Sequence, residues 1–333
     1  MPATQQMEYR KLGNTDLQLS AITYGAFAIG GNMWGGNEQQ ESIKAVRASI
    51  DHGVTTIDTA PFYGFGLSEE LIGKAVTGYD RSKIQLLTKF GLVWDQSKGE
   101  FFFDAADDHG NKLPVYKYAA KDSIIREVEA SLKRLGTDYI DLLQIHWPDA
   151  TTPIAETMET LELLIKQGKI RAAGVSNYSL QQMQTAQQSI QLASNQVPYS
   201  MLNRAIEQDV VPYAIENHIG VIAYSPLERG LLTGKYKPDF KLSDEDHRNG
   251  YFNQFSIGKV NLFLEAIHPL AQEKGASLSQ LVLRWTTLQA GITVVLAGAR
   301  NATQAIDNAK AVDFKLSTEE LAFIDKTFEG ILG

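Results

Sequence analysis

Residues 139–175 read YIDLLQIHWPDATTPIAETMETLELLIKQGKIRAAGV and contain the pattern that decides the fold. Two short apolar runs rich in β-forming residues, 139–145 and 170–175, are predicted strands. Between them, residues 154–167 space their apolar side chains for one buried helical face, and Gly168 follows as a residue suited to the left-handed conformation of a helix C-cap. A strand, a helix and a second strand in this order are typical of a parallel sheet covered by helices.

The same alternation runs along the whole chain. Eight apolar runs are predicted strands: 22–25, 55–57, 84–88, 139–145, 170–175, 194–197, 220–224 and 292–296. The predicted helices between them are 41–52, 68–76, 121–135, 154–167, 179–188, 207–217, 278–289 and 302–309. Eight repeats of strand and helix predict one α/β domain, 1–333, folded as a (β/α)8 TIM barrel. Ahead of the first strand, 9–12 and 17–19 flank a Gly-Asn-Thr-Asp turn and predict an N-terminal β-hairpin that plugs the barrel's N-terminal mouth.

The composition excludes several kinds of chemistry. The 333 residues include no cysteine, which excludes a disulfide framework, a thiolate zinc site, an iron–sulfur cluster and a cysteine nucleophile. A formal net charge of −8 and the lack of a basic stripe argue against a nucleic-acid partner. The first residues carry no signal-peptide pattern, and apolar runs such as 161–165 are far shorter than the roughly 20 residues needed to cross a bilayer. We therefore expect a cytoplasmic protein with no membrane partner and no obligate protein partner.

Two connections are longer than one strand–helix unit requires. Lys89 and His146, taken as the ends of the third and fourth predicted strands, are 57 residues apart, and Tyr224 and Gly298, taken as the ends of the seventh and eighth, are 74 residues apart. The surplus residues are 92–118 in the first case and 230–260, followed by a helix ending at Lys274, in the second. Such excursions above the C-terminal face of a barrel are usually lids or substrate loops, so we expect long βα loops there.

Ionisable side chains follow three neighbouring predicted strands directly. Asp58 and Tyr63 follow the second strand in Asp-Thr-Ala-Pro-Phe-Tyr-Gly, Lys89 ends the third, and His146 ends the fourth. Active sites of (β/α)8 barrels lie at these C-terminal strand ends. Each residue alone fits an ordinary role as a helix cap, a rim side chain or a surface charge. Together on neighbouring strands they predict a catalytic group.

This group is suited to protonating a carbonyl oxygen. The pKa of a phenol is ordinarily ~10, so Tyr63 is a poor acid near neutrality unless a cation stabilises its phenolate. Lys89 would supply that cation, Asp58 would keep Lys89 charged, and His146 would fix the substrate oxygen. No His-x-His pair or set of carboxylates ends these strands, so no metal is predicted.

The second half of the barrel carries residues suited to a nucleotide cofactor. No Gly-x-Gly-x-x-Gly follows a strand, and residues 230–235 match a Walker phosphate loop too loosely to indicate one. Ser176, Asn177 and Gln196 instead end the fifth and sixth strands, where they could hydrogen-bond a carboxamide. Tyr224 ends the seventh strand and offers a flat surface for stacking on an aromatic ring.

A candidate phosphate site follows the eighth strand. There Gly298 begins a turn that leads into the predicted helix 302–309, with Arg300 beside it. A helix N-terminus and a guanidinium both favour an anion. An exposed arginine at a helix start is an equally ordinary interpretation of Arg300, so the residue alone leaves both open.

Together these motifs resemble one family, the aldo-keto reductases, which are NAD(P)H-dependent oxidoreductases built on a (β/α)8 barrel. The resemblance covers nearly the whole chain and rests on Asp-Thr-Ala-x-x-Tyr-Gly at 58–64, Ser-Glu at 68–69, Thr-Lys at 88–89, His-x-Pro-Asp at 146–149, Gly-Val-Ser-Asn at 174–177 and Tyr-Ser-Pro-Leu at 224–227. It implies a catalytic tetrad of Asp58, Tyr63, Lys89 and His146. It also implies the reaction, in which an aldehyde or ketone is reduced by hydride transfer from the nicotinamide while Tyr63 protonates the oxygen.

The resemblance further implies the residues that hold the cofactor. Ser176, Asn177 and Gln196 would bind the nicotinamide amide, and Tyr224 would stack under its ring. The residues implied for the pyrophosphate, the 2′-phosphate and the adenine are, in that order, Ser225, Leu227, Gly230 and Leu232, then Arg300, then Gln304 and Asn308. Arg300 favours NADPH over NADH. Asp307 departs from the family pattern, because a glutamate is common there beside the adenine.

The small-molecule carbonyl substrate would lie against aromatic side chains. The expected pocket residues are Phe27, Trp34, Trp94 and Trp147, with packing in the protein interior as the alternative for each tryptophan. Family members often carry Gly, Thr and Trp where this chain has Thr23, Ala26 and Phe27, which alters the substrate wall. The short tail after Phe328 resembles bacterial members without a long C-terminal substrate loop, so we expect residues 92–118 to shape the pocket instead.

Two other functions stay open as alternatives. Channel-associated proteins share this fold, so the chain could be a nucleotide-sensing regulatory subunit without catalytic activity. Barrel aldolases also place a lysine at a strand end, so Lys89 could form a Schiff base. Turnover of NADPH with a carbonyl compound distinguishes a reductase from a sensor, and borohydride trapping labels Lys89 only in an aldolase.

Overall fold

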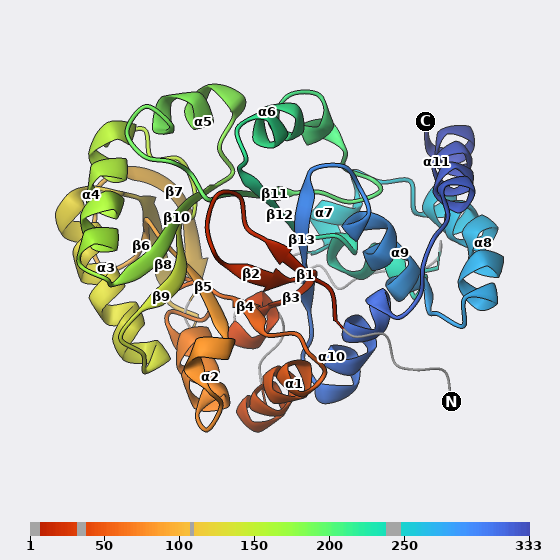
Figure 1. Ribbon diagram of the computed structural model, residues 1–333, viewed down its shortest axis with the longest axis horizontal. Coiled ribbons are helices and arrows are strands. Elements are labelled where there is room, and N and C mark those ends of the chain that lie inside the picture. The colour runs from red at the N-terminus through yellow and green to blue at the C-terminus, as the bar shows by residue number, and fades with distance from the viewer. Residues whose placement is uncertain (1–6, 32–37, 107–109, 238–247) are drawn as a thin grey trace.

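Eight parallel strands close into a barrel in the computed structural model, which describes residues 7–31, 38–106, 110–237 and 248–333 (Figure 1). All eight predicted strands are present, so the predicted barrel is confirmed. They are β3 (Ile22–Gly25), β4 (Thr56–Asp58), β5 (Gln85–Phe90), β9 (Ile140–Ile145), β10 (Ile170–Ser176), β11 (Ser194–Pro198), β12 (Gly220–Tyr224) and β13 (Ile292–Gly298). They follow one another around the barrel in chain order, and β13 pairs with β3 to close it.

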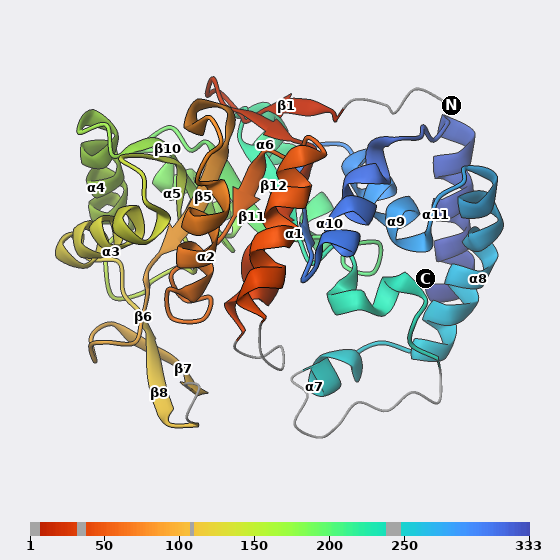
Figure 2. The same ribbon diagram turned by 90° about the horizontal axis from the view of Figure 1, so that it is seen from below.

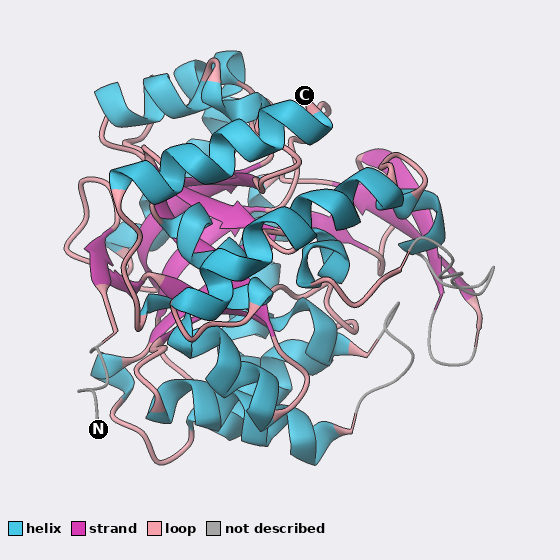
Figure 3. Ribbon diagram, turned by 90° about the vertical axis from the view of Figure 1, so that its right-hand side faces the viewer, coloured by secondary structure: helices cyan, strands magenta, loops and turns pink. Residues whose placement is uncertain are grey.

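Helices surround these strands, and every helix predicted between them is present (Figure 3). They are α1 (Gln39–Asp51), α2 (Leu67–Val76), α3 (Lys121–Leu135), α4 (Ile154–Lys166), α5 (Leu180–Ala186), α6 (Val210–Glu216), α8 (Ile257–Glu273), α9 (Leu278–Thr287) and α10 (Ala302–Ala309). α6 is shorter than the predicted 207–217, because residues 205–207 form a separate 3-10 turn. Asp209 caps the later start by accepting a hydrogen bond from the Val210 N–H at 2.6 Å.

Two helices of the structure were not among those predicted: α7 (Arg248–Phe252) and α11 (Thr318–Leu332). α11 packs on α8, where the rings of Phe263 and Phe328 meet edge to face with centroids 5.8 Å apart. Its sequence does carry a start signal, since the Ser317 and Glu320 side chains form a capping box. No helix in the described part of the chain is both long enough and apolar enough to span a membrane.

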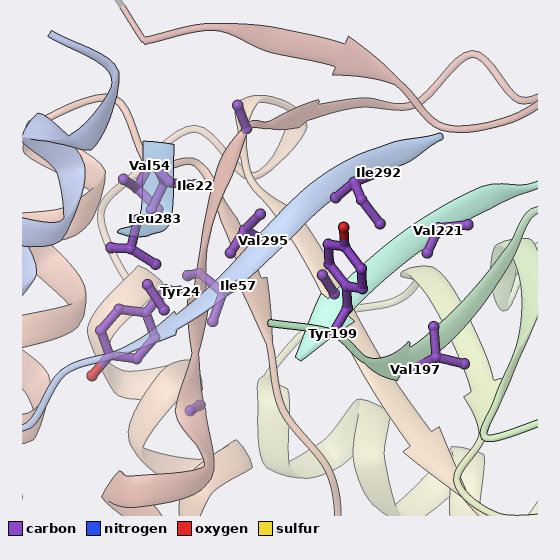
Figure 4. Close-up of a cluster of buried hydrophobic side chains, with 14 of the residues drawn as sticks. Ile22, Tyr24, Val54, Ile57, Val197, Tyr199, Val221, Leu283, Ile292 and Val295 are labelled. Atoms are coloured by element: carbon purple, nitrogen blue, oxygen red, sulfur yellow. The ribbon is translucent and has the colours of Figure 1, made fainter. Parts of the chain in front are cut away.

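Alternation along the strands divides the apolar core into two layers. Leu87 and Leu142 belong to the cluster inside the barrel, whereas their neighbours Leu86 and Leu143 belong to the cluster shared with the helices. Successive side chains of a strand point to opposite faces, so each strand contributes to both layers. Figure 4 shows part of the outer layer around β3, β12 and β13. The strands are therefore buried on both faces, which is why their sequences are nearly continuous apolar runs.

The predicted N-terminal hairpin is present as β1 (Tyr9–Lys11) and β2 (Gln18–Ser20) and covers one end of the barrel (Figure 2). Its leucines join the inner layer almost without exposure: Leu12, Leu17 and Leu19. At Gly13 the backbone has a φ of +51°, and a Cβ there would stand 2.6 Å from the carbonyl oxygen of His218. Only glycine fits so close an approach in this conformation. The hairpin thus plugs the end at which the barrel strands begin.

The excursion expected at residues 92–118 forms a projecting antiparallel sheet. It consists of β6 (Leu92–Val93), β7 (Glu100–Ala106) and β8 (Lys112–Lys117), with β8 in the middle. Figure 2 shows β7, β8 and α7 on the side of the molecule opposite β1. Both long excursions therefore stand at the end where the barrel strands finish, which is the end expected for a site.

Candidate active site

Four ionisable side chains come together at the C-terminal ends of β4, β5 and β9. The Lys89 Nζ lies 2.6 Å from Asp58 Oδ1 and 3.2 Å from the Tyr63 hydroxyl oxygen. The ring of His146 lies edge-on to the ring of Tyr63, with centroids 5.7 Å apart. The fold thus gathers the residues that the sequence analysis singled out, with Lys89 at their centre.

The loop after β4 is held tightly, which fixes the position of Tyr63. The Tyr63 N–H donates to the Ala60 carbonyl oxygen, and the Ser68 N–H donates to the Tyr63 carbonyl oxygen, each at 3.1 Å. Gly64 follows with a φ of +67°, and a Cβ there would stand 2.1 Å from the carbonyl oxygen of Gly30. The two backbones therefore touch, and this contact requires glycine at position 64.

Lys89 is buried and protonated. Burial by itself lowers the pKa of a lysine, but the Asp58 carboxylate and the Tyr63 hydroxyl beside it raise the pKa of Lys89 above its usual value. The Lys89 Nζ also donates to the carbonyl oxygen of Thr59 at 2.9 Å. Each of the three ammonium protons thus has an acceptor, and Lys89 is a fixed positive charge next to Tyr63.

Tyr63 keeps its proton at neutral pH. Burial raises the pKa of Tyr63, and the neighbouring Lys89 charge offsets only part of that rise. The cation expected beside the phenol is present, but the cost of removing a phenolate from water outweighs its attraction. Tyr63 is therefore a neutral phenol that can give up a proton when a reaction demands one.

His146 is a neutral imidazole. Burial, together with the positive charge of Lys89, holds the pKa of His146 well below its usual value. The neutral ring carries one N–H, so it can donate a single hydrogen bond to an oxygen placed beside it. A substrate oxygen near both rings would thus meet one N–H donor and one O–H donor.

Gln196, at the end of β11, contacts the group of ionisable side chains directly. Its amide nitrogen donates to Asp58 Oδ2 at 2.7 Å, while the other oxygen of that carboxylate receives Lys89. The sequence analysis assigned Gln196 to a carboxamide. The structure adds a contact that orients Asp58.

Ser176, Asn177 and Tyr224 form a hydrogen-bonded row at the ends of β10 and β12. The Asn177 amide nitrogen donates to Ser176 Oγ at 3.1 Å and to the His146 carbonyl oxygen at 3.0 Å. The Tyr224 hydroxyl donates to Asn177 Oδ1 at 2.9 Å, and Ser176 Oγ donates to the Gln196 carbonyl oxygen at 2.8 Å. The expected nicotinamide side is thus one network that reaches the backbone of His146.

The loop after β12 has an unusual backbone. Ser225, Glu228 and Arg229 have φ values of +57°, +47° and +53°, and Asn177 has +60°. Side chains other than glycine rarely adopt this left-handed conformation, and residues held in it cluster at ligand sites. The residues expected along the pyrophosphate lie in this loop, three of them partly exposed and the last one buried: Ser225, Leu227, Gly230 and Leu232. Contacts with the rest of the protein must therefore hold this loop in a backbone conformation that its residues do not favour by themselves.

The residues expected around a phosphate and an adenine lie in the turn before α10 and along that helix. Arg300 is exposed, and its backbone N–H donates to Gln304 Oε1 at 2.9 Å. Asn308 donates from its amide nitrogen to the Gly298 carbonyl oxygen at 3.0 Å. Gly298, Arg300 and Gln304 are thus exposed around the N-terminus of α10, where an anion is favoured, whereas Asn308 is buried near the other end of the helix.

The Asp307 side chain is hydrogen-bonded to the residues that cap α9. Its Oδ1 accepts from Gln280 Nε2 at 2.8 Å, and its Oδ2 accepts from Ser277 Oγ at 3.4 Å. Ser277 and Gln280 themselves form the capping box of α9. The departure from the common glutamate is thus accompanied by contacts to a neighbouring helix.

Aromatic side chains lie near the four ionisable side chains. Phe27 lies against Tyr63, with ring centroids 4.9 Å apart. Trp147 directly follows His146 and is partly exposed, and Trp94 packs against the rings of Phe62 and Phe65 in the loop after β4. Trp34, the fourth expected pocket residue, lies outside the described residues.

Sequence reasoning missed a buried ion pair behind β5. Glu69 accepts from Thr88 Oγ1 at 2.6 Å and from Arg134 Nε at 2.7 Å. Because Thr88 precedes Lys89, this contact fixes the strand end that carries the central charge. The Ser-Glu motif at 68–69 was visible in the sequence, but its partner Arg134 lies 65 residues away on α3, and no local pattern reveals it.

A second buried carboxylate was also missed. Glu228, in the loop after β12, accepts hydrogen bonds from the hydroxyls of Ser200 and Tyr251. The Arg229 guanidinium lies 3.9 Å from the centroid of the Tyr251 ring. Tyr251 belongs to α7, so these contacts tie the second long excursion to the loop that carries the expected pyrophosphate residues.

Comparison with known proteins gives matches over almost the whole chain. A model of the aldo/keto reductase family matches residues 21–329. The aldo-keto reductase YhdN of Bacillus subtilis is 39% identical over 98% of this chain and 95% of its own length. The NADH-specific methylglyoxal reductase of Escherichia coli is 36% identical, over 96% and 98%. A probable voltage-gated potassium channel subunit beta of Arabidopsis thaliana is 32% identical, over 92% of each chain.

Solved structures give the same result. The glycerol dehydrogenase AKR11B4 of Gluconobacter oxydans superposes with a TM-score of 0.87 at 35% identity, and the match covers 100% of this chain and 97% of that one. An aldo-keto reductase of Klebsiella pneumoniae in complex with NADPH superposes with a TM-score of 0.72 at 31% identity, covering 97% and 95%. The structural comparison and the sequence comparison therefore point to the same family.

Proposed function

Because the chain belongs to the aldo/keto reductase family of NAD(P)H-dependent oxidoreductases that act on carbonyl and alcohol groups, we propose that it reduces aldehydes and ketones to alcohols with Tyr63 as the proton donor. The observation that carries the proposal is the position of the Lys89 Nζ, 2.6 Å from the Asp58 carboxylate and 3.2 Å from the Tyr63 hydroxyl. A fixed cation at that distance stabilises the phenolate that is left when Tyr63 gives up its proton.

Each residue of the tetrad then has one task. A bound NAD(P)H would supply the hydride for the carbonyl carbon. Tyr63 transfers its proton to the carbonyl oxygen, so the product is a neutral alcohol and Tyr63 becomes a phenolate. Lys89, kept charged by Asp58, stabilises this phenolate until solvent returns the proton. His146, neutral at physiological pH, donates its N–H to the carbonyl oxygen and orients it.

The donor set of the other half of the barrel fits a nicotinamide dinucleotide. We assign the carboxamide to Ser176, Asn177 and Gln196, the face of the ring to Tyr224, the pyrophosphate to Ser225, Leu227, Gly230 and Leu232, and the adenine to Gln304 and Asn308. Amide and hydroxyl groups match the donors and acceptors of a carboxamide, and glycine allows the backbone to approach a phosphate. These assignments rest on the network around Asn177 and on the surface at the start of α10.

NADPH is the proposed cofactor, with NADH as the weaker ligand. The proposal rests on Arg300, an exposed residue directly before the N-cap of α10, where both its charge and the helix N-terminus would favour a 2′-phosphate. A structural neighbour holds NADPH, whereas one relative bears the name NADH-specific. The family thus includes both preferences, and Arg300 is the residue on which the choice is proposed to depend.

The substrate is proposed to be a small carbonyl compound held by a single 1–333 domain. Phe27, Trp94 and Trp147 would line its pocket beside Tyr63 and His146. A Schiff-base aldolase is disfavoured, because the Lys89 amine is protonated and paired with Asp58, whereas attack on a carbonyl needs a free amine. A regulatory role is the second candidate, since one relative is named as a probable channel subunit.

The test is the loss of nicotinamide absorbance when the protein is mixed with NADPH and a panel of aldehydes. We expect turnover by the wild type and a loss of about 100-fold or more in Tyr63→Phe, which keeps the ring and removes the proton. Tyr79→Phe serves as the control. It loses only a hydroxyl that donates to Asp51, outside the proposed tetrad, and should keep its activity. Tight NADPH binding by the wild type without turnover of any carbonyl would instead support the regulatory role.

A further inference from the structure

The strand β7 contains an irregularity at three consecutive phenylalanines. Phe101 pairs with Tyr116 of β8, but Phe103 pairs with Val115, so β7 advances by two residues where β8 advances by one. Phe102 is the extra residue of a β-bulge. In a regular strand neighbouring side chains point to opposite faces, whereas a bulge re-aims a side chain and bends the strand.

The bulge turns Phe102 and Phe103 toward the barrel. Their ring centroids lie 5.0 Å apart, and both side chains are half-buried. Phe101, the residue before the bulge, remains 54% exposed and contacts Tyr116 of its own sheet. The strand therefore presents two adjacent rings inward and one outward.

Both inward rings contact residues that adjoin the tetrad. The centroids of the Phe102 and Trp147 rings lie 5.3 Å apart, and those of the Phe103 and Phe62 rings lie 5.6 Å apart. Trp147 follows His146 in the chain, and Phe62 precedes Tyr63. We call these four rings, Phe62, Phe102, Phe103 and Trp147, the aromatic wall. None of them is fully buried.

A charged side chain, Lys117, helps to fix the position of the Phe102 ring. The Lys117 Nζ lies 5.1 Å from the centroid of the Phe102 ring and 2.9 Å from Glu100 Oε1. An ammonium over a ring face and an ion pair across the hairpin both restrict the rotation of this side chain. Phe102 is therefore restricted in its position within the aromatic wall. The wall remains partly exposed to solvent, next to the groups of the proposed tetrad.

We propose that Phe102 and Phe103 determine substrate specificity by binding an aromatic or extended apolar substituent of the carbonyl compound. The inference rests on the proposed function of the tetrad. Partly exposed rings beside a polar reaction centre gain free energy when an apolar group covers them. A carbonyl oxygen held by Tyr63 and His146 would direct its substituent past Phe62 and Trp147 to the hairpin.

Two aldehydes that differ only by a phenyl group test this directly: hydrocinnamaldehyde and propanal. We expect the wild type to show a higher kcat/KM for hydrocinnamaldehyde. In Phe102→Ala and Phe103→Ala that kcat/KM should fall by about 10-fold or more, because an apolar contact of this size contributes 10- to 200-fold to discrimination. The kcat/KM for propanal should change by less than about threefold.

Phe101→Ala is the matched control, since it removes the same side chain from the outward face of the same strand. It should leave the ratio of the two kcat/KM values unchanged. If an alanine variant fails to fold, Phe102→Leu and Phe103→Leu keep the apolar volume and should lower the ratio by a smaller factor. An unchanged ratio in folded Phe102 and Phe103 variants would overturn the specificity proposal and leave the reductase intact. A wild type that reduces neither aldehyde nor any other carbonyl would overturn both.

Discussion

Asp58 and Lys89 form an ion pair almost completely out of contact with water. The Lys89 Nζ lies 2.6 Å from Asp58 Oδ1, and the side chains are 1% and 2% exposed respectively. The attraction inside such a pair is largely offset by the cost of desolvating both charges, so the pair adds little net stability. What it does achieve is a positive charge at a fixed place beside Tyr63.

Removing one partner of this pair should be costly to both stability and catalysis. In Asp58→Asn, Lys89 would be left as a buried charge without a counterion, and we expect the free energy of unfolding to fall by about 3 kcal/mol or more. Reductase activity should fall with it. Urea unfolding monitored by tryptophan fluorescence measures the change. Asp58→Asn combined with Lys89→Met should regain much of the stability but none of the activity, and equal stability of the single variant and the wild type would contradict the argument.

Arg300→Ala should change the choice of cofactor. A charge-assisted hydrogen bond contributes roughly 1.5–3 kcal/mol, so the Kd of NADPH should rise by about 10- to 100-fold, while that of NADH changes by less than about twofold. Titration of intrinsic fluorescence with each nucleotide gives both constants. Because Arg300 is exposed, the variant should unfold at the wild-type temperature. Equal losses for both nucleotides would remove Arg300 from the 2′-phosphate.

Gly64→Ala should displace Tyr63. An alanine Cβ would stand 2.1 Å from the Gly30 carbonyl oxygen, so the loop has to move, and a shift of about 1 Å in a catalytic group can cost about 100-fold in rate. Gly136→Ala is the matched control, because its φ of +64° is nearly the same as the +67° of Gly64 but its Cβ would meet nothing within 4 Å. That variant should lose about 1 kcal/mol of stability and keep its kcat. Similar kcat values for the two variants would speak against the proposed displacement.

Glu127 on α3 links stability to pH. The oxygens of its carboxyl group lie 2.9 Å from the Gly91 backbone nitrogen and 3.0 Å from Ser123 Oγ, and burial raises the pKa of Glu127 to about 8. The folded protein therefore binds a proton that the unfolded chain releases near pH 4.5. Between these two values the folded state holds more protons, so its stability falls as pH rises.

Glu127→Gln should remove this pH dependence. The wild type should lose up to about 1.4 kcal/mol per pH unit between pH 5 and pH 8 from this one group. The amide mimics the protonated acid, so the variant should be more stable than the wild type at pH 8 and similar to it at pH 5. Glu159→Gln, at an exposed position of α4, should follow the wild-type curve. Unfolding midpoints across the pH range decide the matter, and parallel curves for wild type and Glu127→Gln would refute the assignment.

The barrel could be predicted from the sequence because its strands are buried on both faces. In such a strand Leu86 faces the helices and Leu87 faces the barrel interior, so both have to be apolar. The result is a continuous apolar run that is easily recognised in the sequence. That the residues of the proposed tetrad lie close together could be predicted for a related reason. Parallel strands deliver whatever follows them to one edge, so Lys89 and His146 had to lie near each other.

The contacts that hold the site were not predictable in the same way. Glu69 and Arg134 meet across 65 residues, and Glu228 meets Tyr251 across a segment with no regular strand–helix pattern. Such pairs depend on how helices and loops settle on the barrel. The bulge at Phe102 is likewise invisible in the sequence, because three consecutive phenylalanines give no sign of which ring turns inward.

Leu12, Leu17 and Leu19 fill the barrel from the side away from Tyr63. In the proposed reaction, reactants would therefore approach Tyr63 from the other side, and products would leave by the same route. In such a blind-ended arrangement the molecule that sits deeper has to arrive first and leave last. A hairpin that never touches the reacting atoms would in this way impose an order on the kinetic cycle.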